Sequence, residues 1–289
     1  MNIAFSTIAC PNWTLEETAA KAAQLGYLGV ELRSFHDQSV CVASDPFGRE
    51  PSEIKSVFAD AGVTPMCFAT SVKFDKMINP PVVGRIFMNE EAGVSDVKEY
   101  VDLAERSGVP FVRVFGHILP AAEPKTWSMR RVTERLKLAA QTGRNTDVRV
   151  LIENAGSFAT SESIRELLDL VDSQWLGVSY NTLAAVQTGE CPMEGLKLIM
   201  DSVKVIKISD IDADGNPTLL GEGRLPLEKF VKALVAMDYQ GWIVYEHPAL
   251  WMTGESDVDA DTVLKHAADT LYSWMNSAPT ACTSGSCCC

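Results

Sequence analysis

Two glutamates follow apolar, strand-like runs, where a charged side chain is unusual. Glu153 lies in Val150-Leu-Ile-Glu-Asn154, and Glu246 lies in Trp242-Ile-Val-Tyr-Glu-His-Pro248. Burying a carboxylate is costly unless a cation or hydrogen-bond donors pair with it. Lys207, inside the apolar run Val203-Lys-Val-Ile-Lys-Ile-Ser-Asp210, supplies such a cation. Two carboxylates and one ammonium at strand ends indicate a catalytic centre, with Glu153, Glu246 and Lys207 as its catalytic residues.

Eight short apolar runs, rich in Val, Ile and aromatic residues, are of strand length and recur along the whole chain. They are Ile3–Ala9, Gly29–Leu32, Thr64–Ala69, Phe111–Phe115, Val148–Glu153, Trp175–Tyr180, Val203–Ser209 and Trp242–Glu246.

Longer amphipathic segments separate these runs, and Gly, Pro or Ser often marks their ends, as at helix termini. They are Leu15–Leu25, Ser52–Ala61, Ser95–Ser107, Lys125–Thr142, Ser161–Val171, Pro192–Met200, Pro226–Met237 and Val258–Met275. Eight alternating units predict an α/β protein, a single (β/α)8 TIM barrel with a parallel eight-stranded sheet, over residues 1–275. A dinucleotide fold is disfavoured because no Gly-x-Gly-x-x-Gly follows a strand. Residues 276–289 read as a disordered, Cys-rich tail.

Composition excludes several classes of partner. The chain has 289 residues and a formal net charge of −13, so we expect neither nucleic acid nor an anionic membrane surface as a partner. No run of 18 apolar residues predicts a membrane span, and the first residues do not resemble a signal peptide. We therefore expect a cytoplasmic protein with a small-molecule, carbohydrate-like substrate. A homo-oligomer is compatible with the sequence.

Five segments, in order along the chain, resemble strand-end signatures of the xylose-isomerase-like barrel superfamily, in its sugar phosphate isomerase/epimerase group. They are Gly26-Tyr-Leu-Gly-Val-Glu-Leu32, Leu151-Ile-Glu-Asn154, Val203-Lys-Val-Ile-Lys-Ile-Ser-Asp210, Leu220-Gly-Glu-Gly223 and Gly241-Trp-Ile-Val-Tyr-Glu-His247. The resemblance covers about residues 1–275. It implies one divalent metal, held by a Glu after strand 5, an Asp after strand 6, a His on strand 7 and a Glu after strand 8.

Two of these four ligands are changed in this chain. Glu153 and Glu246 match, but Asn181 stands at the strand-6 position and Lys207 at the strand-7 position. Asn181 still offers a carbonyl oxygen, whereas a protonated lysine cannot ligate and repels a divalent ion. We expect the ammonium to occupy the electrostatic place of the metal. A divalent ion (Mn, Mg or Zn) is thus disfavoured. If one binds, Glu153, Asn181 and Glu246 are its expected ligands, followed by Asp210 or His247.

Further polar groups at strand ends are candidates for substrate binding, together with Asn181. They are Glu31, Arg113, His117 and His247, and Arg33, at the end of the same strand as Glu31, is a further polar group expected to complete the pocket. His117 is a candidate second acid/base or an ordinary rim histidine, and Arg113 pairs either with a substrate anion or with Glu31. Lys207 has two alternatives, an ion pair left over from a dead active site and, less favoured, a Schiff-base lysine, which would need a lowered pKa. Structural contacts alone are the alternative for the two glutamates.

These patterns predict an isomerase/epimerase-like enzyme of carbohydrate metabolism that transfers a proton at the carbon next to a carbonyl. The substrate is small and polyhydroxylated, and the metal site is degenerate. A dehydratase or other lyase on the same scaffold and a non-catalytic sugar-binding barrel are the alternatives. The superfamily that the chain resembles also contains phosphodiester-cleaving repair enzymes. Four histidines in total and the charge of −13 argue against that activity.

Overall fold

Parallel strands close into a barrel in the computed structural model, which describes residues 1–35, 42–76, 92–249, 252 and 259–277. The strand order around the barrel is β1-β10-β7-β6-β5-β4-β3-β2, and β2 pairs with β1 to close it. The strands are β1 (Asn2–Ser6), β2 (Gly29–Arg33), β3 (Thr64–Lys73), β4 (Phe111–Phe115), β5 (Arg149–Glu153), β6 (Leu176–Asn181), β7 (Val203–Ile208) and β10 (Trp242–Tyr245). The predicted single eight-stranded α/β barrel is confirmed.

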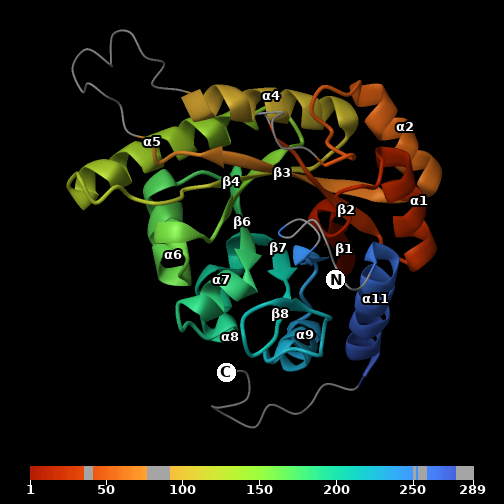
Figure 1. Ribbon diagram of the computed structural model, residues 1–289. Coiled ribbons are helices and arrows are strands. Elements are labelled where there is room, and N and C mark those ends of the chain that lie inside the picture. The colour runs from red at the N-terminus through yellow and green to blue at the C-terminus, as the bar shows by residue number, and fades with distance from the viewer. Residues whose placement is uncertain (36–41, 77–91, 250–251, 253–258, 278–289) are drawn as a thin grey trace.

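Helices surround the barrel and cover its outer face (Figure 1). They are α1 (Leu15–Leu25), α2 (Pro51–Ala61), α4 (Ala92–Ser107), α5 (Lys125–Thr142), α6 (Ser161–Val171), α7 (Thr182–Gln187), α8 (Pro192–Ile199), α9 (Leu227–Ala236) and α11 (Ala260–Asn276). The helix-end signals expected from the sequence are present at α1. The Thr14 side chain accepts a hydrogen bond from the Glu17 amide at the start of α1, and Gly26 ends α1 in a left-handed conformation with φ of 84°.

The barrel interior contains a small cluster of buried apolar side chains, called the floor below. Its buried members, separate from the large core between strands and helices, are Ala4, Met66, Cys67, Leu151, Val205 and Val244. Side chains two residues apart on a strand point to the same face. The residues two positions beyond Leu151, Val205 and Val244 therefore lie in the next layer towards the C-terminal mouth.

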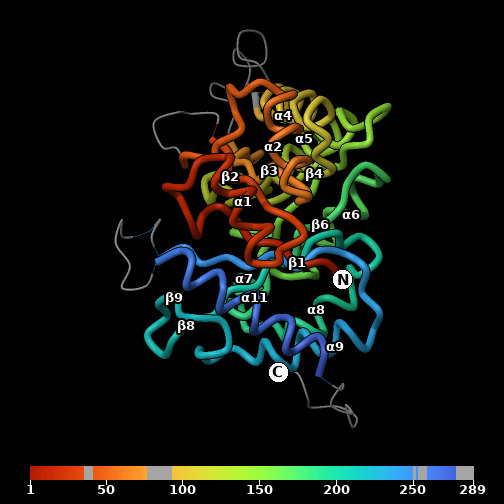
Figure 2. Tube along the Cα trace, turned by 90° about the vertical axis from the view of Figure 1, so that its right-hand side faces the viewer, coloured from red at the N-terminus to blue at the C-terminus, as the bar shows by residue number. Residues whose placement is uncertain are grey.

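Short elements join the main ones at the strand ends. Single turns of 3-10 helix occur at Thr7–Ala9, Gly156–Phe158 and Met200–Ser202. Beyond β7, the two-residue strands β8 (Asp210–Ile211) and β9 (Pro217–Thr218) form an antiparallel hairpin. In Figure 2 this hairpin and the N-terminus, where β1 begins, lie on opposite sides of the molecule, as expected for a hairpin at the C-terminal mouth.

Two expectations concern the ends of the chain and the membrane. The predicted Cys-rich tail at 276–289 lies, from residue 278 onward, outside the described residues. Among the helices that the structure describes, none combines the length and the apolar character needed to cross a membrane.

Candidate active site

One buried ammonium lies at the centre of the polar layer above the apolar floor. Lys207 Nζ is 3.0 Å from Glu31 Oε1, 3.1 Å from Glu153 Oε2 and 2.5 Å from Glu246 Oε1. The side chains of Lys207, Glu31 and Glu153 are 1%, 0% and 5% exposed, whereas that of Glu246 is 17% exposed. Three carboxylates from three different strands or strand ends thus converge on one cation, and Glu246 is the most exposed of them.

Strand alternation explains why these side chains meet. Glu153, Lys207 and Glu246 each follow a floor residue by two positions, so each points into the barrel. The register pairs Lys207 with Val244 on one side and with Asn181 on the other. Inward-pointing side chains at one height of a closed barrel form a layer, and this layer is charged.

Glu153 is held by three partners. Lys207 Nζ donates to its Oε2 at 3.1 Å, Arg113 Nε lies 3.0 Å from the same oxygen, and Asn181 Nδ2 donates to Oε1 at 3.0 Å. Arg113 is fixed in turn, because its Nη1 donates to the carbonyl of Thr70 at 2.7 Å. Glu153 therefore has little freedom to move.

The Asn181 side chain binds both a backbone amide of α7 and the carboxylate of Glu153. Its side-chain oxygen accepts a hydrogen bond from the Ala184 amide at the start of α7, while its Nδ2 donates to Glu153. Asn154 then fixes Asn181, since Asn154 Oδ1 accepts from the Asn181 amide at 2.6 Å and Asn154 Nδ2 donates to the Asn181 carbonyl at 3.0 Å. The carbonyl oxygen expected as a metal ligand is thus occupied as a helix cap.

The pKa values of Glu153 and Glu246 move in opposite directions. Burial alone would raise the pKa of Glu153, but Lys207, Arg113 and the Asn181 hydrogen bond lower it to about 2. Burial raises the pKa of Glu246, and the charge of Lys207 offsets this only in part because Glu153 and Glu31 add to the rise. Burial opposes the charge on Lys207, yet the three carboxylates raise its pKa. Glu153 is therefore shifted towards the ionised form and Lys207 towards the protonated form, whereas Glu246 is shifted towards holding a proton.

Glu31 differs from the other two carboxylates. It forms an ion pair with Lys207, but neither of its buried oxygens accepts a hydrogen bond of good geometry from the described residues. The buried hydroxyls of Ser6 and Ser179, on β1 and β6, also lack a partner there. Unsatisfied buried polar atoms are costly and are concentrated where function requires them.

The two predicted histidines lie outside the cluster around Lys207. His247 Nδ1 lies 3.2 Å from the Tyr245 hydroxyl, and burial lowers the pKa of His247. His117 follows β4 with a φ of 76°, in the left-handed region that strains a non-glycine residue, and its ring is 5.9 Å from that of Phe115. Burial lowers the pKa of His117, and Lys73 lowers it further. Neither histidine contacts Lys207 or its three carboxylates among the described residues, and their roles stay predictions.

Asp210, which with His247 was an alternative metal ligand, is bound by backbone amides instead. Its carboxylate accepts from the amides of Gly221 at 3.0 Å, Gly223 at 3.1 Å and Leu225 at 3.3 Å. These bonds fold the loop after the β8–β9 hairpin. Asp210 therefore shapes the rim and has few lone pairs left for an ion.

Asn154 was not predicted as part of the site, whereas Arg33 was expected among the polar groups that complete the pocket. Asn154 fixes Asn181, and Arg33 at the end of β2 lies within electrostatic reach of Glu31, Glu246 and Glu153. Asn154 could have been found as the polar residue directly after the strand that carries Glu153.

The residues present do not fit the divalent metal that the resemblance implies. The carboxylate oxygens surround the Lys207 ammonium, which cannot ligate while protonated. Asn181 Oδ1 is bound to a helix amide, and Asp210 to three loop amides. Within the described ranges, no group of three or more His, Cys, Asp or Glu side chains is arranged to hold an ion.

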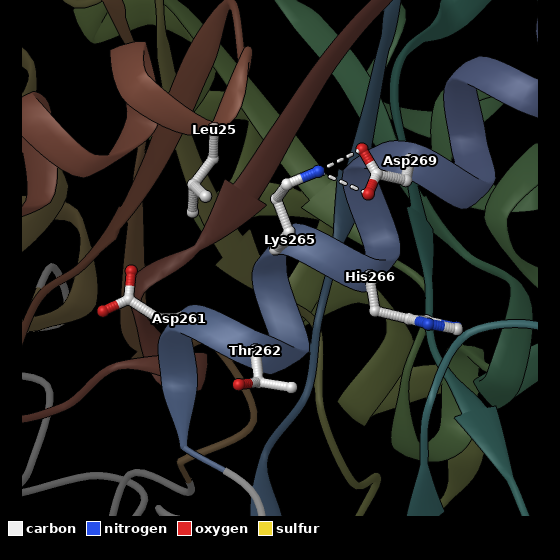
Figure 3. Close-up of a pocket in the computed structure, with 6 residues that line it drawn as sticks. All are labelled: Leu25, Asp261, Thr262, Lys265, His266 and Asp269. Carbon is white, nitrogen blue, oxygen red and sulfur yellow. Dashed lines mark hydrogen bonds and ion pairs between the residues drawn. The ribbon is translucent and has the colours of Figure 1, made fainter.

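A pocket on the outside of the barrel does not belong to this site (Figure 3). Leu25 of α1 lines it, and every other lining residue comes from α11: Asp261, Thr262, Lys265, His266 and Asp269. Its charged groups are paired, as in the contact of 2.7 Å between Lys265 Nζ and Asp269 Oδ1. It offers no group poised for chemistry.

Comparison with known proteins finds that the chain is similar in sequence to a dehydratase. The chain is 20% identical over 264 residues to an inosose dehydratase of Geobacillus kaustophilus (strain HTA426), with 81% of this chain and 80% of that protein covered.

Two solved structures show the same fold at low identity. A structure of L-ribulose 3-epimerase superposes with a TM-score of 0.76 at 16% identity, covering 95% of this chain and 94% of that one. The IolI protein with a bound zinc atom superposes with a TM-score of 0.76 at 14% identity, covering 95% and 98%.

The sequence model of one family, described as the xylose isomerase-like TIM barrel, matches residues 19–274. This span contains Lys207 and the three carboxylates around it. The chain therefore belongs to the xylose isomerase-like TIM barrel family.

Proposed function

We propose that this protein is an enzyme that transfers a proton at the carbon next to a carbonyl of a small polyhydroxylated substrate. The observation that carries the proposal is the convergence of Glu31, Glu153 and Glu246 on the buried Lys207 ammonium, with Glu246 the most exposed of the three carboxylates. Glu246 is pushed towards holding a proton and Glu153 towards losing one. Separation of this kind is typical of groups with distinct acid/base roles.

Glu246 is the proton-transfer group in this proposal. It is the most exposed of the three carboxylates, and its raised pKa makes it a better base than a carboxylate whose pKa is about 2. Lys207 stabilises the negative oxygen that develops on the substrate carbonyl when the proton leaves. Glu153 and Glu31 keep that ammonium charged and in position.

The dehydratase alternative gains support from the environment of Glu153. Epimerisation at one carbon requires that a proton leave one face and return to the other, so it needs two acid/base groups. Glu153 is bound by Lys207, Arg113 and Asn181 and is poorly suited to the second role. β-Elimination of water can use one carboxyl group, which takes a proton from carbon and returns it to the leaving hydroxyl. The similarity to an inosose dehydratase agrees with this alternative.

Hydrogen exchange in D2O tests the shared step before the natural substrate is known. The protein is incubated with a panel of ketoses, inososes and hydroxylated keto acids, and NMR follows deuterium at the α-carbon and loss of water. We expect exchange with at least one compound, and a loss of about 10²- to 10⁴-fold in Glu246→Gln. Glu194→Gln, which changes a surface glutamate paired with Lys197, is the matched control.

Two results would count against the proposal. Exchange that persists in Glu246→Gln would move the chemistry elsewhere, with His117 the next candidate. Binding of panel compounds with no exchange by any of them would favour the non-catalytic sugar-binding barrel.

A further inference from the structure

Arg33 belongs to the same interior wall as the charged layer. It ends β2, two residues after Glu31, so its side chain emerges on the face from which Glu31 reaches Lys207. Because strands run towards the mouth, Arg33 lies one layer nearer to the opening than Glu31. A substrate entering the barrel passes this layer before it reaches Lys207.

The Arg33 guanidinium is held rigidly but is not fully used. Nη1 donates to the carbonyls of Ala69 at 3.0 Å and Thr70 at 3.2 Å, and Nη2 donates to Ser71 Oγ at 3.3 Å. The Phe35 ring lies 4.7 Å from its central carbon. A guanidinium has five N–H donors. One on Nη2 remains, together with the one on buried Nε, which has no partner among the described residues.

The described carboxylates near Arg33 are all bound to other groups. The ion pairs of Glu31, Glu153 and Glu246 go to Lys207, and Glu153 also pairs with Arg113. Asp45, the carboxylate beside β2, accepts hydrogen bonds from the Ser34 hydroxyl and the Phe35 amide. Among the described residues, Arg33 forms no ion pair.

Electrostatics agrees with this geometry. Burial, and then the positive charge of Arg113, lower the pKa of Arg33 to about 10, although the site glutamates act in the opposite direction. Two guanidinium groups that repel each other at a partly buried position are stabilised by an anion near them.

We propose that Arg33 binds a carboxylate of the substrate, so that the substrate class is a small hydroxylated carbonyl compound with a carboxylate group. The inference rests on the proposed function of the same site. The free N–H groups on Nε and Nη2 belong to adjacent nitrogens and match the two oxygens of a carboxylate. A phosphate dianion fits less well, because Glu31, Glu153 and Glu246 lie close to Arg33 and repel its second negative charge.

Binding of matched probes tests this inference without turnover. D-Gluconate, D-glucitol and D-glucitol 6-phosphate carry a carboxylate, no charge and a phosphate on similar polyol chains. Calorimetry on the wild-type protein should give D-gluconate about tenfold or greater preference over D-glucitol, as for charge-assisted hydrogen bonds. Arg33→Gln should abolish the preference and Arg33→Lys should retain part of it. Arg130→Gln, at a surface arginine paired with Glu134, should leave it unchanged.

A second readout follows Arg33 directly in the wild-type protein. The arginine Nε–H resonance that is lost in Arg33→Lys should shift on titration with D-gluconate and stay in place with D-glucitol. A merely structural role would lower the stability of Arg33→Gln but would not change the ratio of the two affinities.

Four outcomes overturn the inference: equal affinity for the carboxylate and neutral probes, an unshifted Nε–H resonance, a preference for the phosphate, or a carboxylate preference that survives in Arg33→Gln. Failure of this inference is distinct from failure of the proposed function. A protein that prefers D-gluconate through Arg33 but exchanges no α-proton refutes only the reaction, whereas exchange with neutral ketoses and no carboxylate preference refutes only the role of Arg33.

Discussion

Replacing Lys207 by Met removes the cation at the centre of the charged layer while keeping most of the side-chain volume. At distances of 2.5 to 3.1 Å, each contact between the ammonium and a carboxylate corresponds to a Coulomb energy of about 5–7 kcal/mol at an effective dielectric constant of about 20. Desolvation and repulsion among the carboxylates cancel much of this sum. Breaking a buried ion pair from one side typically costs about 3–5 kcal/mol. We therefore expect the free energy of unfolding of Lys207→Met to fall by about 3–5 kcal/mol at pH 8.

The loss should shrink as the pH falls. Without the ammonium, the carboxylates repel one another, and the pKa of at least one of them, Glu246, rises further above the usual value of about 4.3. The folded variant then binds more protons than the unfolded chain. Its stability is therefore greatest below the unfolded pKa and is lost as the pH rises through the raised pKa values.

Urea unfolding of both proteins from pH 5 to pH 8 in the presence of a chelator measures this difference. Lys197→Met is the control, because Lys197 is 55% exposed and pairs with one surface glutamate. Its removal should cost less than about 1 kcal/mol at every pH. If Lys207→Met and wild type differ by less than about 1 kcal/mol at pH 8, the converging carboxylates do not depend on the ammonium, and Lys207 is not the counter-charge that stabilises the layer.

Further predictions concern acid stability and the metal. In Glu153→Gln, the acid-induced loss of stability should be smaller than in wild type. The pKa of Glu153 in the folded protein is about 2, below the usual carboxyl value. The ionised Glu153 therefore stabilises the folded protein above the usual carboxyl pKa, and about 3 kcal/mol of this stability is lost as the pH falls through the folded pKa. An unchanged dependence of stability on pH between pH 5 and pH 2, measured by urea unfolding, would contradict this. Wild type should bind Mn²⁺ weakly, whereas Lys207→His combined with Asn181→Asp should bind it tightly, as measured by calorimetry and by metal content after dialysis. Stoichiometric, tightly held metal in dialysed wild type would show that the Lys207 ammonium does not exclude a divalent ion.

The strands were predictable because each is a short run rich in β-branched or aromatic residues, and several follow a helix that ends at a glycine, such as Gly26, Gly62 and Gly143. Their inward faces were also predictable, because alternation places Glu153, Lys207 and Glu246 on the side of the floor residues. The β8–β9 hairpin was not, since two residues per strand carry no periodic signal.

The side-chain contacts across the barrel interior could not be predicted from the sequence. Glu31 on β2 was predicted as a substrate-binding residue, and Arg113 was expected to pair either with Glu31 or with a substrate anion. The structure pairs it with Lys207 on β7, three strands away around the barrel, while Arg113 pairs with Glu153. Strand order and side-chain direction are local properties, but the choice of partner across the interior depends on barrel closure and side-chain reach.

The coordination of Lys207 has a consequence for how a substrate engages it. An ammonium carries three N–H groups, and three carboxylate oxygens already lie within 3.1 Å of it. An incoming oxygen must take the place of one of them, and Glu246, the most exposed, is the one that can move aside. Once separated from the ammonium, the Glu246 carboxylate loses its main stabilising contact and becomes more basic. Binding of the substrate oxygen to Lys207 would then make Glu246 a stronger base. Before the substrate binds, the contact with Lys207 keeps Glu246 less basic.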